Sequence, residues 1–129
     1  MSAWLWPVQK AIYDQIVNEC TYPVYDDVPQ NTDYPYITIG DDTSTEWDTV
    51  DKVGGESTLT VHTWSREAGR REIKKIMSEV YEVLHMHELD VPGYNVVLCR
   101  QEFAESLPVE ADGRTRHGVQ RFRVIIHDE

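Results

Sequence analysis

The order of hydrophobic patterns along the 129-residue chain constrains its fold more than any other feature. The patterns run helix, strand, strand, helix, strand, strand, over residues 3–20, 36–41, 56–64, 65–87, 94–103 and 117–127. Strand patterns that come in adjacent pairs between two amphipathic helices are typical of an α+β domain. We therefore expect a single domain over residues 1–129, with a mostly antiparallel sheet of four to five strands, long loops, and both helices packed on one face.

The apolar residues within these segments have the spacing of the element that each one predicts. Steps of three and four residues mark the two helices, through Leu5, Val8, Ile12 and Ile16 in the first and Ile73, Ile76, Met77, Val80 and Leu84 in the second. Alternation marks the strands, with Ile37 and Ile39 on one face of the first and Phe122, Val124 and Ile126 on one face of the last. Ser2 and Ser65 are the expected helix caps.

Three polar or turn-rich segments separate the patterns. Residues 22–35 are rich in proline and aspartate, and a short strand near Val24 is an option. Residues 42–55 predict either a mobile loop or a long hairpin whose tip is Gly54-Gly55. Residues 104–116 predict a long loop, and loops of that length in a compact domain are usually functional or disordered.

The chain is strongly acidic, with 23 Asp and Glu against 12 Lys and Arg, a net charge of −11 and a pI near 4.8. A surface of this sign repels phosphate backbones, so the charge disfavours a protein that grips DNA or RNA. Two interpretations of the charge stay open. It either serves solubility alone, or lines a ring through which DNA slides without sticking.

Several features bear on the compartment. No stretch reaches the roughly 18 apolar residues that a membrane-spanning helix needs, and the first residues lack the basic flank and apolar run of a signal peptide. We therefore expect synthesis and folding in a cytoplasm. Cys20 and Cys99 lie far apart without metal-type spacing, and in a reducing compartment they predict two free thiols.

Catalytic patterns are weak in this sequence. Clustered carboxylates can hold magnesium in nucleases, and Asp26-Asp27, Asp41-Asp42 and the string Glu46, Asp48, Asp51 offer such clusters. Adjacent acids in turns are more often turn formers. His85 and His87 are two apart, which points their side chains away from each other on a helix. We expect no enzyme, no metal and no cofactor, and a small acidic metal-dependent hydrolase is the least favoured alternative.

Four arginines stand out near the end of this acidic chain: Arg114, Arg116, Arg121 and Arg123. Alternation places Arg121 and Arg123 on the strand face opposite Phe122 and Val124. They either form the solvated outer face of a half-buried sheet, or pair with an acidic loop of a neighbouring subunit, around residues 41–51. Separate patches of opposite sign suit a head-to-tail ring, whose interface joins two different surfaces of one protomer.

Four strings carry a family resemblance: Tyr-Asp-Asp-Val-Pro at 25–29, Pro-Tyr-Ile-Thr-Ile-Gly at 35–40, Val-His-Thr-Trp-Ser-Arg-Glu-Ala-Gly-Arg at 61–70 and Arg-Thr-Arg-His-Gly at 114–118. With them, nearly the whole chain resembles the tail-terminator, or tail-completion, proteins of long-tailed bacteriophages and prophages. The resemblance implies a structural virion protein that forms a ring, typically a homohexamer. The ring would cap the tail tube, stop its polymerisation and offer a surface for head–tail joining.

The resemblance also implies partners and a place. The partners would be further copies of the chain, the tail-tube protein and a head–tail connector protein, with DNA passing through the lumen during ejection without specific binding, and no membrane. The place would be the head-proximal end of the virion tail, after assembly in the host cytoplasm. Another head–tail connector, a neck protein or a minor tail component is the alternative. The candidate subunit and tube contacts are Asp26, Asp27, Asp41, Asp42, Trp47, Asp48, Asp51, Arg114, Arg116, Arg121 and Arg123.

Overall fold

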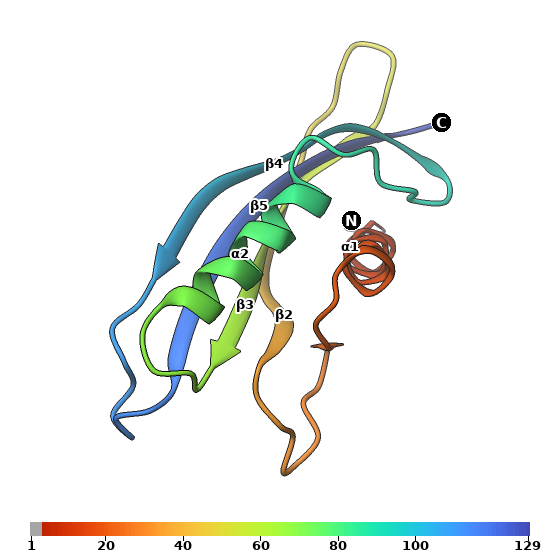
Figure 1. The fold of residues 1–129 in the computed structure, drawn as a ribbon. Helices are drawn as coiled ribbons and strands as arrows, with labels where there is room; N and C mark the ends of the chain where they lie inside the picture. Colours follow the sequence, from red (N-terminus) through yellow and green to blue (C-terminus); the bar gives the residue numbers. More distant parts are fainter. Residues whose placement is uncertain (1–3) are drawn as a thin grey trace.

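A computed structural model describes residues 4–129 as an α+β fold built on one five-stranded sheet (Figure 1). In chain order the elements are α1 (Leu5–Glu19), β1 (Val24–Tyr25), β2 (Tyr36–Glu46), β3 (Gly54–Ser65), α2 (Arg71–Leu84), β4 (Tyr94–Ser106) and β5 (Arg116–Asp128). The strand order is β1-β2-β3-β5-β4, and only the short β1 pairs in parallel. The expected α+β class and mostly antiparallel sheet are confirmed, as is the short strand at Val24.

Both helices bury their apolar stripes in one core against the sheet (Figure 1). The predicted α2 stripe is buried at every position, from Ile73 to Leu84. In α1 the buried positions are Val8, Ala11, Ile12 and Ile16, whereas Leu5 is partly exposed at the helix start. The sheet contributes its inward side chains to the same core, among them Ile37, Ile39, Leu59, Val61, Phe122, Val124 and Ile126.

The starts of both helices differ from the predicted ones. Helix α1 begins at Leu5, and the expected cap Ser2 lies outside the described residues. Helix α2 begins at Arg71, so Ser65 is not its cap but the last residue of β3. The prediction was wrong because residues 66–70 connect strand and helix through bends at 67–70, with Gly69 in a left-handed conformation at φ 83°.

The segment between β2 and β3 is a long hairpin rather than a mobile loop. Strand β2 continues to Glu46, and Gly54 and Gly55 are the buried first residues of β3. The tip lies instead near Thr49 and Lys52, where the Thr49 N–H donates to the Lys52 carbonyl at 2.9 Å. The prediction of a Gly-Gly tip was therefore wrong.

The last two strands pair over most of their length and leave β4 at the sheet edge. Strand β4 runs three residues past its predicted end, so the loop that precedes β5 is residues 107–115 rather than 104–116.

Cys20 and Cys99 are both free, as expected. No helix within residues 4–129 is long and apolar enough to cross a membrane.

Candidate assembly surfaces

The sheet face turned away from the helices carries a row of stacked rings. Tyr36, Trp64 and His117 are partners in the registers of β2, β3 and β5, which sets them side by side across three strands. The Trp64 and His117 rings are nearly parallel, with centroids 3.9 Å apart and an angle of 9°. His62 shares this face because it lies two residues from Trp64 in β3, and its ring centroid is 4.9 Å from that of His117.

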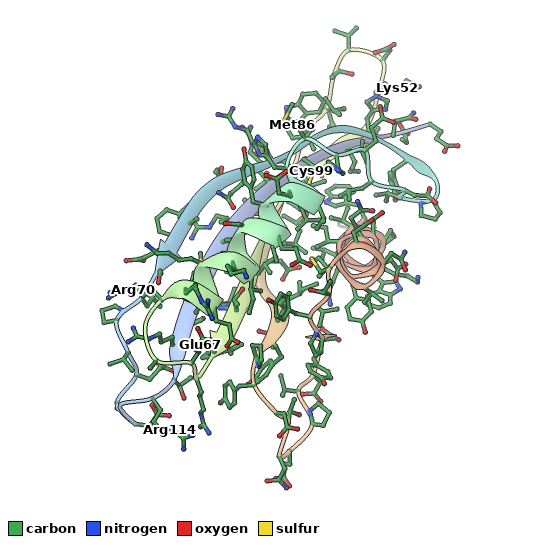
Figure 2. All side chains as sticks on the ribbon, viewed as in Figure 1. Lys52, Glu67, Arg70, Met86, Cys99 and Arg114 are labelled. Carbon is green, nitrogen blue, oxygen red and sulfur yellow. The ribbon has the colours of Figure 1, made fainter. Side chains whose placement is uncertain are left out.

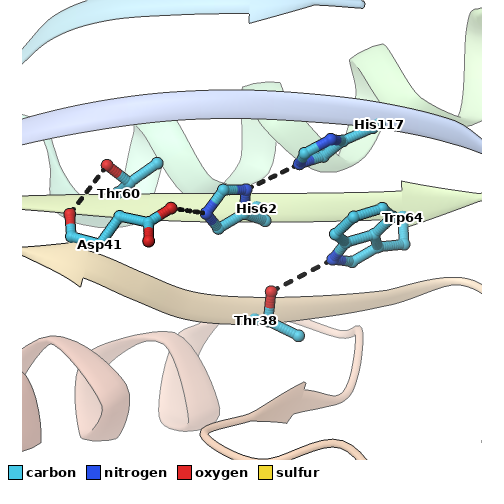
Figure 3. A network of polar contacts seen from close by, with 6 residues as sticks. All are labelled: Thr38, Asp41, Thr60, His62, Trp64 and His117. Atoms are coloured by element: carbon cyan, nitrogen blue, oxygen red, sulfur yellow. Dashed lines mark hydrogen bonds and ion pairs between the residues drawn. The ribbon is translucent and has the colours of Figure 1, made fainter.

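A polar network runs through the same row (Figure 3). The His62 Nδ1 and His117 Nε2 atoms are 2.7 Å apart, and the other nitrogen of His62 lies 3.1 Å from the Asp41 carboxylate. The Trp64 indole N–H donates to the Thr38 hydroxyl at 3.1 Å, so the largest ring of the row is also fixed in its plane. The rings and the network together make this face a rigid surface rather than a set of mobile side chains.

Contact with His62 affects the pKa of His117. Burial lowers the pKa of His117 from its ordinary value of 6.5, and a charge on His62 lowers it further, while Glu110 and Asp41 act weakly in the other direction. Because two imidazolium ions in contact repel, a charge on His62 disfavours the protonated form of His117.

Next to this row lies a shallow groove of about 510 Å³ that brings acidic and basic candidates together. Asp41 and Asp42 line it from β2, Arg121 from β5 and Glu102 from β4. Arg121 lies over the Phe103 ring, 5.8 Å from its centroid, and forms no ion pair with another residue of the described chain. Groups of opposite charge thus line one groove of a single protomer, and their pairing between subunits stays a prediction.

Arg123 shares this face with Arg121, as the alternation predicted, but differs in its partner. Its guanidinium pairs with the Glu56 carboxylate of the neighbouring strand β3, and this pairing raises the arginine pKa. Strand register explains the contact, because Arg123 pairs with Thr58 and Glu56 lies two residues away on the same face. Arg123 therefore already has an acidic partner before any subunit contact.

Arg114 and Arg116 lie at the other end of the molecule. Arg114, in the β4–β5 connection, is exposed at the end of the molecule opposite Lys52 of the β2–β3 hairpin (Figure 2). Asp112 holds the turn before β5 by accepting from the N–H groups of Arg114 and Thr115 and from the Thr115 hydroxyl. These hydrogen bonds lower the pKa of Asp112 to about 2. The four arginines thus form two groups rather than one stripe.

The β2–β3 hairpin carries the candidates Trp47, Asp48 and Asp51 on a projection beyond the sheet (Figure 1). Asp48 has a structural role, because its carboxylate accepts from the Gly54 N–H at 3.1 Å and holds the base of the tip. Trp47 is half-buried there. Asp51 lies at the exposed tip beside Val50, whose side chain is fully exposed.

Asp26 and Asp27 follow β1 as exposed residues in a bend. The Asp26 carboxylate accepts from the Gln9 side-chain amide of α1 at 2.9 Å, which ties this bend to the first helix. The candidate residues are therefore distributed over separate surfaces: the Asp41–Arg121 groove, the hairpin, the β4–β5 connection and the bend after β1.

Sequence reasoning missed the stacked row of Tyr36, His62, Trp64 and His117 as a unit. The signal was present, since His62 and Trp64 alternate with the buried residues of their strand, but the partners on β2 and β5 follow only from the register. As for metal chemistry, within residues 4–129 no group of three or more His, Cys, Asp or Glu side chains is placed to hold an ion.

Comparison with known proteins gives a family match over most of the chain. The family model described as "Tail completion protein gp17" matches residues 11–127. The tail completion protein gp17 of Bacillus phage SPP1 is 32% identical over 114 residues, which are 88% of this chain and 81% of that protein.

Two solved structures share the fold. A chain in the virion of a native gene transfer agent particle superposes with a TM-score of 0.88 at 19% identity, covering 98% of this chain and 99% of that one. The structure of the bacteriophage SPP1 gp17 protein superposes with a TM-score of 0.64 at 24% identity, covering 96% and 94%. At these identities the likeness concerns the arrangement of helices and strands.

Proposed function

This chain belongs to the tail completion protein gp17 family, and from that premise we propose that it forms a ring which caps the tail tube, stops tube polymerisation and provides the surface for head–tail joining. The observation that carries the proposal is the match of residues 11–127 to that family, together with a 32% identical tail completion protein. The partners are then the tail-tube protein, a head–tail connector protein and further copies of the chain.

The placement of the candidate residues supports a ring. A head-to-tail ring needs two different, complementary surfaces on one protomer, and a self-complementary dimer needs one. Here an acidic hairpin projects from one end of the molecule, and Arg114 is exposed at the other end (Figure 2). We propose that two different surfaces of the chain, one of them the hairpin, join neighbouring copies around a homohexamer.

The charge supports a lumen that does not hold DNA. At a net charge of −11, a ring of these chains repels the phosphate backbone over the whole passage. Specific DNA binding depends largely on Lys and Arg contacts to phosphates, and a chain with this balance supplies few of them. DNA would therefore pass during ejection without sticking.

If the ring stops tube growth, its two faces must differ. One face complements the growing end of the tube, and the other must not present the same surface again, because polymerisation would then continue. A head–tail connector, neck protein or minor tail component would bind the tail as well, but without an effect on tube length. Tube length therefore separates the two functions.

The direct test is tube growth with purified components. Tail-tube protein polymerises alone, or with rising molar ratios of this chain, and tube lengths are measured by negative-stain electron microscopy. A terminator shortens the length distribution and leaves a ring at a tube end. Tubes that bind the chain but keep their length would favour the connector function, and tubes that neither bind nor shorten would reject both.

A further inference from the structure

A groove of about 680 Å³ runs between helix α2 and the edge strand β4. Met77, Tyr81 and Ala104 supply apolar lining, and Arg70 and Lys74 line it near the start of α2. Both cations form no ion pair with another residue of the described chain. The groove therefore offers an apolar lining and two unpaired positive charges, and the carboxylates of Glu82 and Glu105 line it as well.

Two buried polar atoms in this groove lack partners. Gln120 is 1% exposed, and its amide nitrogen donates to the Met77 carbonyl and to the Gln101 side chain, each at 2.8 Å. Its amide oxygen accepts no hydrogen bond from any described residue, and neither does the Ser106 hydroxyl oxygen form one. Buried polar groups in folded proteins nearly always have partners, and these two atoms are the buried polar positions of the groove lining that lack one.

The occupant must come from outside the protomer, and the chain carries a suitable segment. The hairpin tip has two exposed valines, Val50 at 107% and Val53 at 59%, which flank Asp51 and Lys52. Lys52 and Arg70 lie far apart in the molecule (Figure 2), so the tip does not reach the Arg70 end of its own groove. A contact between tip and groove is therefore a contact between two copies.

We propose that the tip of the β2–β3 hairpin, residues 49–53, docks into the α2–β4 groove of the next copy around the ring. The tip and the groove match at three points. Val50 covers apolar lining at Met77 and Tyr81, Asp51 faces Arg70 and Lys74, and a backbone N–H or the Thr49 hydroxyl donates to the Gln120 amide oxygen. The contact joins two different surfaces of the same chain, as a closed ring requires. This inference rests on the proposed ring, whose neighbour relation it specifies.

Disulfide trapping tests the contact in assembled particles. Val50→Cys on the tip and Ser78→Cys in the groove are combined in one chain that complements a deletion of the gene. Burial raises the pKa of Cys99 to about 12, and burial with the nearby Glu79 and Glu19 raises that of Cys20 to about 12, so both natural thiols form the reactive thiolate less readily than an exposed cysteine. The matched control pairs Val50→Cys with Lys10→Cys, at an exposed position of α1.

The expected result is a ladder of cross-linked oligomers on a non-reducing gel for the tip–groove pair and monomer for the control pair. A monomer for both pairs, in particles with tails of normal length, would overturn the docking while leaving the proposed function intact. A cross-link to the tail-tube protein would overturn it as well. If deletion of the gene leaves tail length unchanged, the terminator function fails independently of the gel.

A charge exchange gives a second readout. Lys74→Glu should reduce the cross-linked fraction because it sets two carboxylates against each other, and the further change Asp51→Lys should restore it. Loss of cross-linking in both variants, or in neither, would contradict the pairing of these two charges.

Discussion

Gly55 is fixed by its neighbour Trp4 rather than by backbone geometry. A Cβ atom at Gly55 would overlap the Trp4 indole ring, which packs on the start of β3 and donates its N–H to the Ser44 hydroxyl at 2.7 Å. The close approach anchors the first helix to the base of the hairpin. At this position glycine is needed for its small size, since its φ is not in the left-handed region.

Gly55→Ala should therefore lower the free energy of unfolding by about 1–3 kcal/mol, the usual cost of an added methyl group in a packed site. Urea denaturation followed by tryptophan fluorescence measures it. Gly40→Ala in strand β2 is the matched control, because a Cβ there meets nothing within 4 Å. Equal stabilities of the two variants would mean that Trp4 does not pack on β3 as described.

Because His117 contacts His62 and is half-buried, it makes the free energy of unfolding depend on pH. Burial and the neighbouring His62 lower the pKa of folded His117 below 6.5, whereas the unfolded chain protonates near that value. As the pH falls below 6.5, the unfolded state takes up a proton that the folded state resists, so this contribution to stability is present at neutral pH and lost on acidification.

His117→Gln should flatten the fall of the urea midpoint between pH 7.5 and pH 5, because the group that resists protonation is gone. His87→Gln, at an exposed histidine beyond α2, is the matched control for the removal of one imidazole. If both variants follow the wild-type curve, His117 does not titrate in this window and the account of the pair is wrong.

At the scale of elements, the start of α2 is secured from β3. The Ser65 hydroxyl is fully buried, donates to the Glu72 carboxylate at 2.6 Å and accepts from the Glu67 N–H at 3.2 Å. These contacts bridge the bends at residues 67–70 and hold the first turn of the helix against the strand. Ser65 thus stabilises the start of the helix without occupying the cap position that its sequence context suggests.

Ser65→Ala should cost about 1 kcal/mol of unfolding free energy, since one net hydrogen bond is lost and the Glu72 carboxylate loses its donor. Ser78→Ala on the exposed side of α2 is the matched control and should be neutral or slightly stabilising, because alanine is the better helix former. Chemical denaturation of both variants measures the two changes in unfolding free energy. A neutral Ser65→Ala would show that the bends are held by other contacts.

The sequence predicts an element correctly when the pattern that marks it lies within the element itself. The α2 stripe from Ile73 to Leu84 and the alternation at Ile37 and Ile39 are local, and the structure buries all of these residues. Gly54-Gly55 also looks local, as a turn, but its meaning depends on Trp4, some fifty residues earlier. The tip of the hairpin was therefore predicted at the wrong residues, because this distant contact determines where β3 begins.

The candidate surfaces follow the same rule. Alternation correctly places Arg121 and Arg123 on the uncovered sheet face. The pairing of Arg123 with Glu56 depends on the register of β3 against β5, which no local pattern specifies. A residue pattern can therefore identify charged surfaces, while the structure is needed to tell which charges are already paired.

At the scale of the whole molecule, Arg121 and Arg123 should differ as interface residues, because Arg123 already pairs with Glu56 and Arg121 has no ionic partner in the described chain. Arg121→Glu reverses a charge without an ionic partner in the described chain, so the unfolding free energy should stay within about 0.5 kcal/mol of wild type while ring assembly on tails is lost. Arg123→Glu should also destabilise the monomer slightly, because an exposed ion pair contributes about 0.2–1 kcal/mol and a repulsive contact replaces it.

Denaturation of the monomer and electron microscopy of complemented particles measure the two effects separately. Complete rings with Arg121→Glu would remove this residue from the interface and leave the hairpin and the α2–β4 groove as the surfaces to examine.

The most direct test of the terminator function is to image particles from which the protein is missing. Negative-stain electron microscopy of the phage or particle with this gene deleted should show abnormally long tail tubes separate from filled heads, because nothing ends tube growth or joins the two parts. Tails of normal length, attached or not, would contradict the account and indicate a different role in the virion.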